Sequence, residues 1–184
     1  MTHLIVGPTL ETRRLILRPP ELQDFEPLVE LTGDAETMRF ITGETMDRFA
    51  TWRMLAANVG AWVMKGCSMF SVIEKESGKW VGRIGPIDIP GWPGTEVGWM
   101  VLKDFRGKGY AYEAVVACMD FAVDELGWQE IIHSIEPANL VSRKLAEKLG
   151  SRILRQQRLD PPFDKDISDI WGQSAAEWRA RKKV

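Results

Sequence analysis

Hydrophobic and polar residues follow two different periods along the chain, which separates an early helical part from a longer sheet-forming part. Arg14–Arg18 alternates charged and apolar residues, which predicts a first strand that ends at Pro19–Pro20, where backbone donors are missing. Asp24 is a good helix-capping residue, so a helix is expected from there to about Gly33.

Two more helices are expected before the central strands, at Asp34–Phe40 and Asp47–Met64. In the longer one, apolar residues recur three or four positions apart and form a stripe that is expected to be buried. Its members are Trp52, Leu55, Val59 and Trp62. Gly66 is expected to end this helix.

The middle of the chain has the alternation and turn residues of antiparallel strands. Met69–Lys75 and Trp80–Asp88 are separated only by Glu76–Lys79, a turn short enough to force them into a hairpin. Thr95–Leu102 is expected to be the next strand. Between these strands, Pro90–Gly94 is a rigid connector carrying Trp92, and it fits a surface loop better than a lid over a substrate.

The second half of the chain alternates helices with strands. The expected order is helix 109–126, strand Glu130–Ile135, helix Asn139–Leu149, strand 151–159 and strand Ile167–Gln173. Asp160–Asp166 is expected to be a loop, and Ser174–Glu177 has the spacing of a capping box for a terminal helical turn. Because strands joined by a helix can run in the same direction, we expect an α/β fold with a mixed sheet. The sheet should be antiparallel in its N-terminal half, parallel at the central strands and flanked by helices.

Composition narrows the class of protein. A length of 184 residues with 45% hydrophobic residues suits one domain, 1–184, and the formal net charge of −2 disfavours nucleic-acid binding. No apolar run is long enough for a membrane span and no signal peptide is recognisable, so a cytoplasmic location is expected. Cys67 and Cys118 are expected to be reduced and packed. His3 and His133 are poorly placed for a hydrolase triad, and no metal site is expected.

The best candidate for a binding site is the segment Arg106–Ala111, which lies between a predicted strand and a predicted helix. Gly107 and Gly109 allow the backbone amides to turn inward, and the helix N-terminus adds a positive dipole that suits a diphosphate. Arg106 and Lys108 would add positive charge nearby. The spacing matches neither a P-loop nor a dinucleotide fingerprint. Taken alone, these residues could also form a tight turn with solvated charges.

Longer motifs resemble a known superfamily. Thr95–Leu102 followed by Arg106–Ala114 resembles the central motif of the GNAT N-acetyltransferases, whose diphosphate loop reads Arg/Gln-x-x-Gly-x-Gly/Ala. Glu136–Gly150 resembles their second coenzyme motif. Leu10–Arg18 and Ser174–Trp178 resemble the branch that contains bacterial ribosomal-protein N-terminal alanine and serine acetyltransferases. One departure is Ser151, which stands where an aromatic residue often follows the second motif.

The resemblance implies an N-acetyltransferase fold that uses acetyl-coenzyme A as co-substrate. It implies that the diphosphate is held by backbone amides of the loop, with Lys108 nearby, and that main-chain groups of the preceding strand meet pantetheine. The implied coenzyme-binding residues are Val101, Leu102, Arg106, Gly107, Lys108, Gly109, Ala111 and Asn139. Asn139 also suits the N-cap of its own helix.

Two side chains are candidates for proton transfer. Glu96 resembles the family's water-relayed general base, although it could also be an edge residue that faces solvent or pairs with Arg83. Ser142 is the candidate donor to the departing thiolate, with an exposed helix position as the alternative. Trp92 is the one tryptophan expected to contact an acceptor.

The acceptor is expected to be an amine. An α-amine is about 1 kcal/mol from its neutral form at pH 7, against about 4 kcal/mol for a lysine side chain. A single water-relayed carboxylate therefore favours a protein or peptide N-terminus, or an amino acid. A polyamine or aminoglycoside acetyltransferase, and an acyl-coenzyme A sensor without catalysis, remain alternatives. Oligomeric state is left open.

Overall fold

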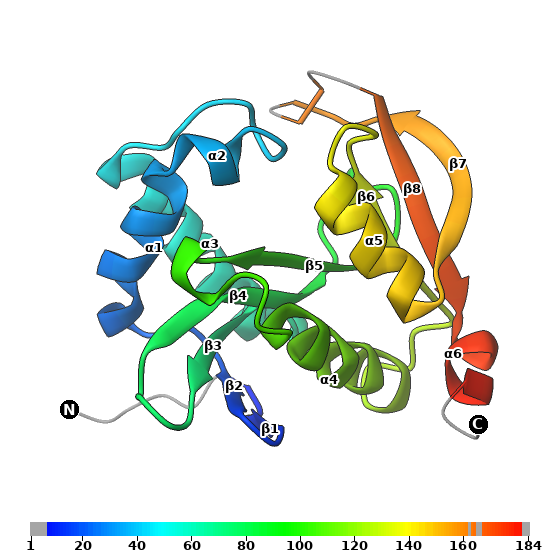
Figure 1. The fold of residues 1–184 in the computed structure, drawn as a ribbon, viewed down its shortest axis with the longest axis horizontal. Coiled ribbons are helices and arrows are strands. Elements are labelled where there is room, and N and C mark those ends of the chain that lie inside the picture. The colour runs from blue at the N-terminus through cyan, green and yellow to red at the C-terminus, as the bar shows by residue number, and fades with distance from the viewer. Residues whose placement is uncertain (1–6, 162, 165–166, 182–184) are drawn as a thin grey trace.

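The computed structural model describes residues 7–161, 163–164 and 167–181. His3 and part of the expected loop Asp160–Asp166 lie outside these residues. Within them, the strands form one sheet of eight in the order β1-β2-β3-β4-β5-β6-β8-β7. In Figure 1, α1 to α3 lie beside the N-terminal half of this sheet, and α5 lies next to the strands of its C-terminal half.

After a short first strand, the helices and strands follow one another in the order expected from the sequence. The N-terminal half consists of β1 (Leu10–Glu11), β2 (Leu15–Arg18), α1 (Phe25–Gly33), α2 (Ala35–Met38), α3 (Arg48–Lys65), β3 (Phe70–Glu74), β4 (Trp80–Ile87) and β5 (Glu96–Val101). The C-terminal half consists of α4 (Tyr110–Asp124), β6 (Glu130–Ile135), α5 (Leu140–Leu149), β7 (Arg152–Arg158), β8 (Ile167–Ser174) and α6 (Ala175–Arg181). Short 3-10 turns occupy Leu22–Asp24 and Lys103–Phe105.

The mixed sheet expected from the sequence is confirmed. Strands β1 to β5 are antiparallel, and β5 and β6, which α4 connects, are the parallel pair. The next crossover, through α5, does not place β7 beside β6, because β8 inserts between them and pairs with both in antiparallel register. The C-terminal strand thereby completes the half-sheet that carries α5.

Local signals explain most element boundaries. Asp47 caps α3 by accepting a hydrogen bond from the Ala50 amide, and Gly66 ends this helix in the left-handed conformation. The expected capping box is present, because the Ser174 amide donates to the Glu177 carboxylate and the Glu177 amide donates to Ser174 Oγ. β1 was not expected, since two residues carry too little pattern to be recognised.

One packing expectation is wrong. Trp52 is 46% exposed and packs edge-on against Phe25 of α1, and Val59 is only half-buried, whereas Leu55 and Trp62 are buried as expected. The cause is that α3 covers the sheet only with the face that carries Leu55 and Trp62. Cys67 and Cys118 are both free and buried, as expected. No helix of the described residues is long and apolar enough to cross a bilayer.

Candidate active site

The sheet opens between its two central strands. Strands β5 and β6 are in register only at Glu96 and Ile132, where the Ile132 amide donates to the Thr95 carbonyl at 2.9 Å. One residue further along β6, the His133 side chain reaches the Val97 carbonyl of β5 in place of a backbone amide, at 2.7 Å. Figure 1 shows the two strands diverging beyond this point. Within the described part of the chain, no strand pairs with the rest of this edge of β5.

The alternation of a strand decides which main-chain groups of β5 face this opening. Carbonyls of Thr95 and Val97 point to the β6 side, so the amide and carbonyl groups of Trp99 and Val101 point the same way. Leu102 points to the other side, where its amide donates to the Val81 carbonyl, and its carbonyl accepts from Phe105. Both main-chain groups of Leu102, which were expected to meet a ligand, thus already have partners in the protein, whereas those of Trp99 face the opening.

The loop after β5 has the backbone that an anion site requires. Gly107 has φ 74° and Gly109 has φ 81°, both in the left-handed region that side chains disfavour. The amides of Gly107 and Gly109 have no hydrogen-bond acceptor among the described residues. Ala111 lies in the first turn of α4, where amides have no partner within the helix. Three amides next to a helix N-terminus are thus free to bind one anion.

Arg106 does not play the part expected of it. Its amide already donates to the Lys103 carbonyl at 3.2 Å, and its guanidinium turns away from the loop. Nε donates to the Val101 carbonyl at 3.1 Å, and Nη2 donates to Thr37 Oγ1 and to Asp34 at the start of α2. Arg106 therefore fixes the strand end and the loop to α2 instead of supplying charge to a ligand.

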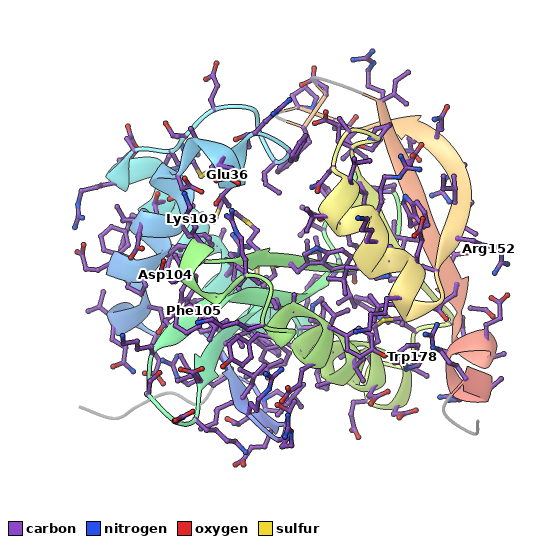
Figure 2. The ribbon with its side chains drawn as sticks, in the orientation of Figure 1. Glu36, Lys103, Asp104, Phe105, Arg152 and Trp178 are labelled. Atoms are coloured by element: carbon purple, nitrogen blue, oxygen red, sulfur yellow. The ribbon has the colours of Figure 1, made fainter. Side chains whose placement is uncertain are left out.

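The turn that leads into the loop is held by the same helix. Lys103 lies 3.8 Å from the carboxylate of Glu36, which also lies 3.5 Å from Arg106. Figure 2 shows Glu36 of α2 beside Lys103, with Phe105 at the end of the turn. The Phe105 ring is buried in the core, and the Lys108 ammonium lies over it at 5.3 Å. Lys108 remains exposed, so its charge can still reach a ligand.

Arg14 supports the loop from behind, a role that the strand pattern did not reveal. Its guanidinium pairs with Glu113 of α4 at 2.7 Å and donates to the Lys108 carbonyl at 2.9 Å. It also lies 4.3 Å from the centre of the Tyr110 ring. These contacts join the residue before β2 to the C-terminal part of the loop and to the first turn of α4.

Glu96 is buried beside the opening, with 6% of its surface exposed. One carboxylate oxygen accepts hydrogen bonds from Trp92 Nε1 at 2.8 Å and from Ser134 Oγ at 2.7 Å. Burial raises the pKa of Glu96 to about 6, and these hydrogen bonds act in the opposite direction without cancelling it. Glu96 is therefore not an edge residue that faces bulk solvent, and it forms no ion pair with Arg83.

The connector Pro90–Gly94 is more than a surface loop. Trp92 is half-buried, donates to Glu96 and packs edge-on against Phe163 at 5.1 Å. The indole therefore fixes the Glu96 carboxylate as well as lining the space around it. Ser134, the second donor, sits on β6 with no sequence signal of its own.

Ser142 faces the opening from the first turn of α5. Asn139 caps this helix, as expected, by accepting from the Ser142 amide at 3.1 Å. The indole Nε1 of Trp99 donates to Ser142 Oγ at 3.2 Å. Because an indole N–H can only donate, Ser142 accepts this bond and its own hydroxyl hydrogen stays available to another group.

His133 has a structural part that its place inside a strand concealed. The ring packs at 5.0 Å from Trp99, and Nδ1 lies 2.7 Å from the Val97 carbonyl. Since that carbonyl can only accept, Nδ1 carries the proton. Burial lowers the pKa of His133 to about 4, so the ring is neutral at physiological pH. The neutral imidazole ends the pairing of β5 with β6 and thus sets where the sheet opens.

A cavity of about 390 Å³ adjoins these groups. Glu96, Trp92, Ser134, Asn139 and Ser142 all line it. Its other walls come from the 39–43 segment, from α3 and from β4. A ligand in this cavity would meet both proton-transfer candidates.

Comparison with known proteins agrees with this geometry. Residues 14–152 match the sequence model of the family described as acetyltransferase (GNAT) domain. The chain belongs to the GNAT acetyltransferase family. It is therefore an acetyltransferase, and its family uses acetyl-coenzyme A as co-substrate and an amine as acceptor.

The relatives of this acetyltransferase include an uncharacterized N-acetyltransferase, YnaD, from Bacillus subtilis, which is 27% identical over 78% of this chain and 82% of its own. An acetyltransferase from Agrobacterium tumefaciens has a TM-score of 0.78 at 27% identity and covers 94% of this chain and 98% of its own. A ribosomal-protein-S5-alanine acetyltransferase from Vibrio fischeri has a TM-score of 0.75 at 17% identity, covers 94% and 99%, and shares the fold.

Proposed function

We propose that this acetyltransferase transfers the acetyl group of acetyl-coenzyme A to a primary amine, with a preference for an α-amine. The amine attacks the thioester directly, and Glu96 receives its proton through water. The observation that carries this proposal is a buried carboxylate with a pKa of about 6 at the start of β5, where the sheet opens, with a loop of unpaired amides following the other end of the same strand.

The loop fits the coenzyme diphosphate. Gly107, Gly109 and Ala111 offer main-chain donors at the N-terminus of α4, and Lys108 adds a mobile charge. Gly109 could not carry a side chain here without strain, since its φ is 81°. The open edge of β5 then suits pantetheine, whose amides can pair with the main-chain groups of Trp99 as an added strand would.

Two groups would manage charge at the thioester. The Val101 amide points into the opening, where it can stabilise the negative charge that develops on the carbonyl oxygen as the amine attacks. The Ser142 hydroxyl can donate to the departing sulfur, because its oxygen already accepts from Trp99. We assign Asn139 to the end of pantetheine, since it lines the same cavity.

The strength of the base favours an α-amine. A carboxylate whose pKa is about 6 takes a proton from an amine of pKa about 7.7 at a cost of about 2 kcal/mol. The same transfer from a lysine ammonium, with a pKa of about 10.4, costs about 6 kcal/mol. Peptide N-termini and amino acids are therefore better acceptors than lysine side chains or polyamines.

Release of the coenzyme A thiol tests this proposal. The protein is incubated with acetyl-coenzyme A and matched amines: peptides with a free or an acetylated N-terminus, amino acids, polyamines and aminoglycosides. We expect release with free α-amines and none with the blocked peptides. Tight binding of the coenzyme without release for any amine would instead identify a sensor.

A further inference from the structure

Arg83 lies on β4 at the inner wall of the cavity, where it contacts α3. Its guanidinium donates to Asn58 Oδ1 at 3.2 Å and to Met54 Sδ, both on α3. A thioether is a weak acceptor, and Asn58 shares its oxygen with the Ser68 hydroxyl at 3.2 Å. The five donors of this guanidinium are therefore poorly satisfied.

No carboxylate of the described residues forms an ion pair with Arg83. Its Nε is buried and has no hydrogen-bond partner in the described part of the chain. Burial lowers the pKa of Arg83 to about 10, so the side chain is still charged at neutral pH. The Arg83 side chain is half-buried in the cavity wall, where a charge without a counter-ion is costly and a bound anion would complete the pair.

The other acidic groups around the cavity are engaged or lie elsewhere. Asp88 pairs with Lys65 at 2.6 Å, and Glu96 is held by Trp92 and Ser134. Glu136 lines the cavity from the end of β6, across the opening from β4. An anion at Arg83 would therefore have to come from a bound molecule.

Strand register places Arg83 and Glu96 on one face of the sheet. Arg83 is opposite Met100 and Ile87 is opposite Glu96, so the two charged residues are four positions apart along paired strands. At about 3.3 Å per residue, this separates their backbones by about 13 Å along the strands. Gly98 lies between them on β5, and the side chains of Ile87 and Met69 pack over it.

We infer that the amine acceptor carries a carboxylate, which pairs with Arg83 while its amine lies at Glu96. This inference rests on the proposed function and narrows its substrate class to amino acids or short peptides with a free carboxylate. The arrangement explains why a guanidinium is kept in the cavity wall without a partner from the protein. A bidentate pair would also fix the orientation of the acceptor.

Acceptors that differ only in this charge test the inference. An amino acid, a dipeptide and a tripeptide of alanine and glycine are each compared with the corresponding C-terminal amide. We expect kcat/KM to be at least tenfold higher for the acid at one length or more. In Arg83→Gln this preference should disappear, mainly through KM, and Arg83→Lys should keep part of it because it keeps the charge. Arg39→Gln, which removes an exposed arginine of the same cavity, is the matched control.

The possible results are distinct. Equal use of every acid and amide by the wild type, or a preference that survives Arg83→Gln, would overturn the inference. Should Arg83→Gln not fold, the wild-type comparison and Arg83→Lys decide. If no amine is acetylated, the proposed function fails by itself. Carboxylate binding by Arg83 is then tested by thermal unfolding with the N-acetylated peptide acids and with their amides. Only the acids should stabilise the wild type.

Discussion

Replacing Glu96 by glutamine should make the protein more stable while removing most of its activity. The carboxylate is buried, and its pKa rises from 4.5 to about 6 on folding. A shift of about 1.5 units corresponds to about 2 kcal/mol of stability that the ionised group costs the folded state. Glutamine keeps an oxygen that accepts from Trp92 and Ser134, yet it carries no charge to desolvate.

The pH dependence gives this prediction its signature. A carboxyl group whose folded pKa is raised binds its proton more tightly in the folded state, so the wild type loses stability as pH rises from 4.5 to 6. Below pH 4.5 both proteins carry a neutral side chain and should differ little. Above pH 6, Glu96→Gln should be more stable by about 2 kcal/mol, while kcat falls about 100-fold or more.

Urea unfolding of both proteins between pH 4 and pH 8 measures the difference, and thiol release measures the activity. Glu136→Gln is the matched control, because it removes one negative charge from the same cavity without touching Trp92 or Ser134. It should stay within about 0.5 kcal/mol of the wild type. A Glu96→Gln protein that is less stable than the wild type at pH 8, or a difference that does not change with pH, would refute the reasoning.

Three further perturbations test other parts of the site. Gly109→Val should abolish the stabilisation of about 2.7 kcal/mol expected from coenzyme A at 100 times its dissociation constant. Gly127→Val, at a positive φ of 70° in a remote turn, should keep that stabilisation. If thermal unfolding shows that Gly109→Val keeps the stabilisation and Gly127→Val loses it, the loop does not bind the coenzyme diphosphate. Ser142→Ala should lower kcat about tenfold with little change in coenzyme affinity, and a thioester with a more acidic thiol should recover part of the loss; an equal loss with both thioesters would exclude Ser142 as the donor. His133→Gln should make the free energy of unfolding less dependent on pH between pH 6.5 and pH 4. The folded pKa of about 4 lies below 6.5, so the wild type loses about 3 kcal/mol as pH falls from 6.5 to 4, and an unchanged limb in urea unfolding would contradict this assignment.

The sequence predicts the elements and the loop because their causes are local. Gly107 and Gly109 indicate a turn because of their backbone freedom, and Asn139 indicates a helix cap because of its side-chain chemistry. Leu102 shows the limit of such reasoning, since a one-residue difference along a strand decides which way its amide points. That choice depends on Val81, which is distant in sequence.

The partners of the charged residues could not be predicted. Arg106 binds α2 and Arg14 binds α4 because the fold brings these helices beside the loop, and neither contact has a signal in the sequence. The raised pKa of Glu96 likewise depends on burial beneath Trp92 and beside Ser134. The lack of a counter-ion for Arg83 becomes visible only when its surroundings are known.

A crystal structure of the protein with coenzyme A tests the central claim most directly. We predict that the diphosphate oxygens lie within hydrogen-bonding distance of the amides of Gly107, Gly109 and Ala111, and that pantetheine runs along Trp99 and Val101 toward Glu96. A diphosphate bound elsewhere, with those three amides turned away from it, would contradict the account.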